Sequence, residues 1–123
     1  MVRPSLVSIV DDDESVREAL PDLLRSFGFE AQPFESAETF LASEALTRTG
    51  CLVLDVAMPG MTGPELQREL ARRKIDLPIV FITAQADDRI EDEARRRGAS
   101  AFLLKPFDES AIVGAVRTAL GQA

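Results

Sequence analysis

Short, almost continuously apolar runs recur along this chain of 123 residues, and stretches with helical periodicity separate them. The clearest runs are Leu6–Val10, Cys51–Leu54, Ile79–Ile82 and Ala101–Leu104. Runs of this length without polar alternation are typical of strands that are buried on both faces of a parallel sheet. The weaker segment Glu30–Phe34 lies where a fifth strand would fall, and we expect it to form an edge of the sheet.

Between these runs, apolar residues recur at the spacing of an amphipathic helix. The predicted helices cover residues 16–27, 36–41, 62–70, 87–97 and 108–120. Pro21 lies inside the first of them, where it removes a backbone hydrogen bond and is expected to kink the helix. The alternation of strands and helices predicts an α/β fold, doubly wound, with a parallel sheet and helices on both faces. We expect a single domain over residues 1–123, with its core at about 5–120.

Composition and charge exclude several classes of function. The net charge of −7 argues against direct nucleic acid binding, which needs a basic surface, and the lack of histidine excludes histidine-based catalysis and metal ligation. No apolar run is long enough to cross a membrane, so no membrane partner is expected. The single cysteine, Cys51, is interpreted as a small buried residue, and a cytoplasmic location is the simplest prediction. The arginine clusters at 72–74 and 95–97 are interpreted as helix ends, with a docking patch as the alternative.

Polar residues with reactive side chains follow the predicted strands. In chain order they are Asp11, Asp12 and Asp13, then Asp55, then Thr83, then Lys105 before Pro106. In doubly wound sheets ligands bind beyond the carboxyl ends of the strands, so these residues should meet at one edge. Clustered carboxylates repel one another, and a hard divalent cation such as Mg²⁺ relieves that repulsion. Lys105 and the Thr83 hydroxyl suit phosphoryl oxygens, and Asp55, at the centre, suits a nucleophile.

These motifs resemble a known family when they are taken together. The pattern is Val10-Asp11-Asp12, Asp55 followed by Met58-Pro59-Gly60-Met61-Thr62-Gly63, Thr83-Ala84, and Lys105-Pro106-Phe107. It resembles the receiver domain of two-component response regulators, over about Leu6 to Leu120, and is most similar to regulators of the nitrogen-fixation and nodulation type. The resemblance implies the flavodoxin-like (βα)5 fold with strand order 2-1-3-4-5; the sequence by itself predicts only the alternation.

The resemblance also implies roles for individual residues. Asp55 would be the phosphoacceptor, and Mg²⁺ would be held by Asp11, Asp12, Asp55 and the backbone carbonyl of Ala57. Thr83 and Lys105 would hold the phosphoryl oxygens, and they would share the catalytic role with Asp55.

The resemblance also implies two structural features, an aromatic switch and a cis peptide bond. Phe102 would be an aromatic switch that turns inward when Thr83 moves, although an ordinary strand residue is the alternative. The Lys105-Pro106 peptide bond would be cis. Asp13 is interpreted mainly as a helix cap, and Gly60 and Gly63 as loop residues.

The function implied by the resemblance is a signalling switch. A sensor histidine kinase would donate the phosphoryl group to Asp55, and the surface over 87–97, 101–104 and 108–120 would then control an output domain or partner protein. The chain would catalyse its own phosphorylation and slow dephosphorylation without being a conventional enzyme. Two questions are left open. The chain could form a phosphorylation-dependent homodimer, and it could be either a stand-alone receiver or a piece of a longer regulator.

Three rival functions fit the sequence less well than a receiver. An aspartyl-phosphate hydrolase would need a second aspartate at Ala57, and a flavodoxin-like electron carrier would need a hydroxyl-rich phosphate loop where Asp11–Asp13 stand. A degenerate receiver that only binds proteins would lack a site residue, whereas every position of the pattern is filled. Because Ala57 has no side chain that could orient a water, we expect a long-lived phosphoryl group.

Overall fold

The computed structural model describes residues 5–122 as one sheet of parallel strands covered by helices. The strands are β1 (Leu6–Val10), β2 (Glu30–Phe34), β3 (Thr49–Asp55), β4 (Ile79–Thr83) and β5 (Ala101–Leu104). Their spatial order is β2-β1-β3-β4-β5, and every neighbouring pair is parallel. The predicted doubly wound fold and its strand order are confirmed, with β2 at one edge as expected.

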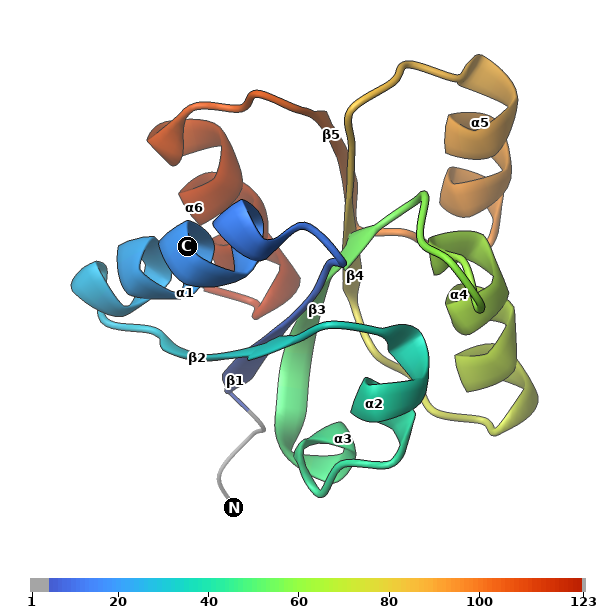
Figure 1. Ribbon diagram of the computed structural model, residues 1–123, viewed down its shortest axis with the longest axis horizontal. Coiled ribbons are helices and arrows are strands. Elements are labelled where there is room, and N and C mark those ends of the chain that lie inside the picture. The colour runs from blue at the N-terminus through green and yellow to red at the C-terminus, as the bar shows by residue number, and fades with distance from the viewer. Residues whose placement is uncertain (1–4, 123) are drawn as a thin grey trace.

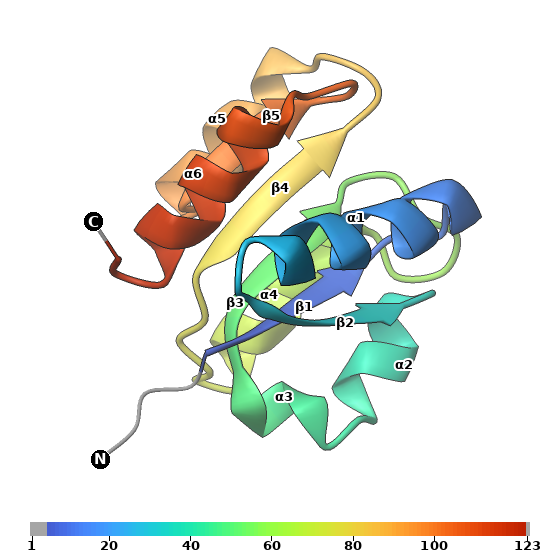
Figure 2. The same cartoon turned by 90° about the vertical axis from the view of Figure 1, so that its left-hand side faces the viewer.

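The helices form a layer on each face of the sheet. They are α1 (Glu14–Ser26), α2 (Ala37–Leu41), α3 (Ala45–Arg48), α4 (Gly63–Arg72), α5 (Asp88–Arg96) and α6 (Glu109–Ala119). Helices α1 and α6 cover one face, and the other four cover the opposite face (Figures 1 and 2). This two-sided cover explains why the central strands β1, β3 and β4 are buried at every residue except Gly50.

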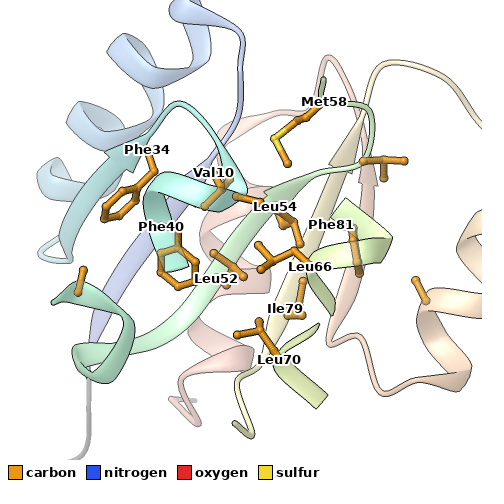
Figure 3. Close-up of a cluster of buried hydrophobic side chains, with 14 of the residues drawn as sticks. Val10, Phe34, Phe40, Leu52, Leu54, Met58, Leu66, Leu70, Ile79 and Phe81 are labelled. Atoms are coloured by element: carbon orange, nitrogen blue, oxygen red, sulfur yellow. The ribbon is translucent and has the colours of Figure 1, made fainter. Parts of the chain in front are cut away.

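Each face of the sheet has its own hydrophobic cluster, because successive side chains of a strand point to opposite faces. On the face covered by four helices, the core includes Phe40, Leu54, Leu66 and Phe81, all fully buried (Figure 3). The core on the other face is built from residues such as Ile9, Leu24, Val53, Ile82 and Ile112. Packing in these two clusters sets the positions of the strands. The loops that follow the carboxyl ends of the strands therefore begin at defined places.

The structure differs from the sequence prediction in a few places. Helix α3 was not predicted, because its four residues are too few to show periodicity and no side chain caps its first turn. Strand β3 begins at Thr49 rather than Cys51, since the Thr49 hydroxyl finds buried partners in Ser8 and the Ala45 carbonyl. Helix α1 continues from Glu14 to Ser26 although Pro21 lies inside it.

The ends of the helices follow ordinary capping chemistry. The predicted capping box of α4 is present, with Thr62 and Glu65 each accepting from the other's backbone N–H. The arginine clusters end α4 and α5, and most of their guanidinium groups pair with glutamates one turn earlier in the same helix. None of the helices within residues 5–122 is both long and apolar enough to cross a lipid bilayer.

Candidate functional site

The predicted site residues meet at the carboxyl ends of the strands. Asp11 follows β1, Asp55 ends β3, Thr83 ends β4 and Lys105 follows β5. Asp55, Thr83 and Lys105 border a cleft at this edge of the sheet, and Asp11 is buried next to it. The lining of the cleft also includes Asp12, Asp13, Ala57, Ala84, Gln85 and Asp87. The residues come from four strands, and the order of those strands in the sheet is what brings them together.

Three carboxylates of this cleft lie close enough to share one cation. Asp11, Asp12 and Asp55 each offer an oxygen, and these oxygens lie within 4.8 Å of one another. Asp11 is fully buried and Asp55 is 5% exposed, whereas Asp12 is open to solvent. The cluster therefore has two acids held inside the protein and a third at the solvent side, where an ion could enter.

Lys105 reaches the two buried acids from the far end of the chain. Its Nζ lies 2.8 Å from Asp11 Oδ2 and 3.5 Å from Asp55 Oδ1. Burial by itself lowers the pKa of Lys105, but the hydrogen bond to Asp11 and the charges of both acids outweigh it and raise the pKa. The lysine is therefore a cation in this site and offsets part of the acidic charge.

One lysine does not balance the cluster. Burial, and then the neighbouring charge of Asp11, raise the pKa of Asp55 to about 7 in spite of the attraction of Lys105. A carboxyl group with that pKa is only partly ionised at neutral pH. The site thus needs further positive charge before Asp55 can be a fully ionised nucleophile.

The donor atoms fit a hard divalent cation. All of the side-chain ligands in the cluster are carboxylate oxygens, which are the ligands that Mg²⁺ and Ca²⁺ prefer. The uncompensated negative charge around Asp55 also favours binding of a cation. The acidic cluster is therefore a candidate metal centre, and Ala57 borders the same cleft.

The loop after β1 holds the acids in place through local contacts. Asp11 accepts a hydrogen bond of 2.9 Å from the backbone N–H of Asp13, and Asp13 caps α1 by accepting from Ser15. The guanidinium of Arg17 donates to the Asp11 carbonyl at 3.1 Å. As predicted, Asp13 caps the helix, and its side chain also borders the cleft.

The loop after β3 packs its backbone against Asp55. Val56 donates to the Ile82 carbonyl, and Gly63 donates to the Val56 carbonyl. A Cβ atom at Gly63 would collide with the Asp55 carbonyl oxygen, so only glycine allows α4 to begin this close to Asp55. Gly63 was predicted to be a loop residue, but it begins α4, and no pattern in the sequence indicates this packing role. Gly60, with a φ of +74°, has the predicted loop geometry.

Thr83 and Phe102 lie where the prediction puts them, and their contacts are specific. The Thr83 hydroxyl donates to the Gln85 carbonyl at 3.1 Å, within the loop that leads to α5. Phe102 is half-buried on β5, and its ring centroid lies 5.8 Å from that of Phe81. The Lys105-Pro106 peptide bond is cis. Phe102 does not border the cleft, so any effect on it must pass through neighbouring side chains.

Comparison with protein families decides what kind of domain this is. Residues 7–117 match the model of the response regulator receiver domain. The chain belongs to that family. It is a receiver domain of two-component signalling systems, as its motifs predicted, and the fold and the acidic cluster described above are those of this receiver.

Individual relatives agree with the family and with the predicted subgroup. The chain is 45% identical to the response regulator protein TmoT of Ectopseudomonas mendocina over 94% of this chain and 53% of the relative. It is 44% identical to nodulation protein W of Bradyrhizobium diazoefficiens over 91% of this chain and 49% of the relative. The crystal structure of FixJ-N superposes with a TM-score of 0.88 at 39% identity, covering 99% and 98% of the two chains.

These matches confirm the predicted similarity to nitrogen-fixation and nodulation regulators. The chain spans about half the length of the curated relatives that it matches.

Proposed function

We propose that the receiver accepts a phosphoryl group on Asp55 in a Mg²⁺-dependent reaction and signals by a change of shape. The observation that carries the proposal is the group of charged side chains around Asp55. Lys105 Nζ lies 3.5 Å from Asp55 Oδ1. Asp11, Asp12 and Asp55 each offer a carboxylate oxygen within 4.8 Å of the others, close enough to hold one cation together. Among the carboxylates at the cleft, Asp55 is therefore the one whose neighbouring groups could bind the oxygens of a phosphoryl group.

The chain's own residues account for most of the transfer. An Asp55 carboxylate oxygen attacks the phosphorus of the donor, a P–O bond forms, the bond to the donor atom breaks, and the leaving group takes up a proton. Lys105 is placed to hold a phosphoryl oxygen as a point charge. When bound by Asp11, Asp12, Asp55 and the Ala57 carbonyl, Mg²⁺ would supply charge neutralisation for the phosphoryl oxygens.

The shape change would begin at Thr83. In the structure its hydroxyl donates to the Gln85 carbonyl, and transfer of that donor to a phosphoryl oxygen would move the loop that leads to α5. Phe102 packs next to Phe81 on neighbouring strands, so we propose that its ring follows the loop inward. The surface made by α5, β5 and α6 would then carry the signal, as a two-state element biased by a local charge.

The partners follow from this chemistry. A sensor histidine kinase is the proposed phosphodonor, because the chain has no histidine of its own. An output domain or partner protein is the proposed receiver of the signal, since the curated relatives extend well beyond the matched half. Direct nucleic acid binding by residues 1–123 is not expected at a net charge of −7, and the cytoplasmic location stays a prediction.

Labelling with a small phosphodonor tests the proposal. The protein is incubated with acetyl phosphate, with Mg²⁺ or with a chelator, and intact mass and molecular size are measured. We expect one phosphoryl group per chain with Mg²⁺ and none with the chelator. Failure of the wild-type chain to take up label from acetyl phosphate and from phosphorylated kinases would overturn the assignment, and an increase in size on labelling would establish the homodimer.

A further inference from the structure

The loop between Asp55 and α4 is held by an acid that lies outside the cleft. Glu38, the second residue of α2, accepts a hydrogen bond of 3.1 Å from the backbone N–H of Met61. The two residues are 23 positions apart in the sequence. We propose that Glu38 is a positioning residue for the phosphorylation site, and that it acts by holding the loop that carries the Ala57 carbonyl.

Helix α2 gives the Glu38 side chain a rigid base. Ala37 and Phe40, on either side of it in the helix, are fully buried in the core of this face, and Ser36 caps the helix by accepting from Thr39. The helix therefore gives the Glu38 backbone a fixed place in the fold, while its exposed side chain reaches the loop through the hydrogen bond from Met61.

The loop itself is shaped around that carboxylate. At Gly60 the backbone has a φ of +74°, and a Cβ atom there would lie only 2.7 Å from Glu38 Oε2. The glycine lets the turn come close to the acid, so that the next N–H, that of Met61, points at it. The backbone conformation at Gly60 and Met61 is thus complementary to the position of the Glu38 carboxylate.

The remaining contacts of the loop explain why this one matters. At its first end Val56 is bound to the Ile82 carbonyl and to Gly63, and at its last end Thr62 is bound in the capping box of α4. Between those ends lies the stretch from Ala57 to Met61, in which Met58 is buried and Met61 is bound by Glu38. Without Glu38, Met61 at the end of this stretch loses its hydrogen bond, and the Ala57 carbonyl should become less well ordered.

The inference rests on the proposed function, because a metal-binding carbonyl at Ala57 is part of that function. Its signature is weaker Mg²⁺ binding with little loss of phosphorylation rate at saturating Mg²⁺. Loss of about one net hydrogen bond corresponds to a weakening of about threefold to tenfold. Asp11, Asp12 and Asp55 are untouched, so binding should not be abolished.

Three substitutions at one position separate the hydrogen bond from the charge. Glu38→Gln keeps an acceptor oxygen at the same reach but removes the charge, whereas Glu38→Asp keeps the charge but is one methylene too short. Glu38→Ala removes both. Glu35→Ala, an exposed glutamate just before the α2 cap, is the matched control. Mg²⁺ affinity is measured by titration calorimetry, and hydrogen exchange of the Met61 amide is followed by NMR.

We expect Glu38→Ala and Glu38→Asp to weaken Mg²⁺ binding by about threefold to tenfold and to speed exchange of the Met61 amide. Glu38→Gln and Glu35→Ala should stay within about twofold of wild type. Unchanged Mg²⁺ affinity in Glu38→Asp, or equal weakening in Glu38→Gln and Glu38→Asp, overturns the inference. If the wild-type chain itself binds no Mg²⁺ and takes no label, the proposed function fails instead.

Discussion

Two buried polar groups of this domain have opposite energetic characters. On the face covered by four helices, the Ser8 and Thr49 hydroxyls lie 2.7 Å apart, and Thr49 also donates to the Ala45 carbonyl. At the carboxyl edge of the sheet, Asp11 and Asp55 share one lysine between them. The hydroxyl pair is neutral and satisfied, whereas the acid pair is charged and short of positive charge. The first group serves stability, and the second keeps an unbalanced charge because its function requires one.

The largest expected effect tests the functional half of this contrast. Asp55→Asn removes the nucleophile while leaving the shape of the cleft, so labelling by acetyl phosphate should fall to background in the presence of Mg²⁺. Intact-mass measurement gives the readout. Thr49→Val is the control, and it should label like wild type, because Thr49 lies at the start of β3 and far from Asp55 at its end. Label on the Asp55→Asn protein would mean that another residue accepts the phosphoryl group.

The same substitution should raise stability when Mg²⁺ is absent. The pKa of Asp55 is raised to about 7, so ionising it in the folded protein at pH 8 costs free energy that asparagine does not cost. We expect Asp55→Asn to increase the free energy of unfolding by on the order of 2 kcal/mol at pH 8 with a chelator present. Urea titration followed by circular dichroism measures it.

The pH dependence of that gain has a definite sign. A carboxyl group whose folded pKa lies above its unfolded value stabilises the fold below the unfolded pKa and loses that contribution as pH rises through the folded pKa. The advantage of Asp55→Asn should therefore be small near pH 4 and grow up to about pH 7. A gain that is constant across this range would show that charge is not its cause. Saturating Mg²⁺ should reduce the gain, because the cation stabilises the cluster of three acids in the wild type more than the two acids that the variant keeps.

The satisfied pair should respond in the opposite direction. Thr49→Val leaves the Ser8 hydroxyl and the Ala45 carbonyl without this partner in a buried place. We expect the free energy of unfolding to fall by about 1.5 kcal/mol at every pH and with or without Mg²⁺. A dependence on Mg²⁺ would contradict the separation of the two regions.

The smallest expected effect concerns the lifetime of the phosphoryl group. Ala57 borders the cleft but has no polar side chain that could orient a water. Ala57→Asn should therefore speed the loss of label by about fivefold, equivalent to about 1 kcal/mol of activation free energy. The decay is followed by mass after the donor is removed, with Ala84→Ser, also at the edge of the cleft, as the control. A wild-type label that disappears within seconds would contradict the predicted long lifetime.

The contrast also explains what the sequence could predict. The strands at Leu6–Val10 and Ala101–Leu104 were predicted with their observed bounds, because continuous apolar runs of this length have a clear pattern. The expected burial on both faces was wrong for Ala101–Leu104, which is an edge strand and only partly buried. The acids and Lys105 were predicted to meet, because parallel strands bring their carboxyl ends to one edge. Thr49 was excluded from its strand because a buried hydroxyl pair cannot be read from one sequence position.

Other features of the site depend on close contacts that have no pattern along the chain. Nothing in the sequence indicates that Gly63 touches the Asp55 carbonyl or that Glu38 reaches Met61. The sequence likewise does not indicate the hydrogen bond between the Thr83 hydroxyl and the Gln85 carbonyl. Each depends on the path of a loop, and loop paths are set by packing in three dimensions.

The span of the Lys105–Asp11 contact has a consequence for biosynthesis. The two residues are 94 positions apart, so the acids are translated well before the lysine, which follows the last strand of the sheet. A nascent or prematurely terminated chain that lacks Lys105 has the acceptor aspartate without its cation. We expect such products to be silent in signalling, so that only a receiver translated almost to its last helix can be switched on.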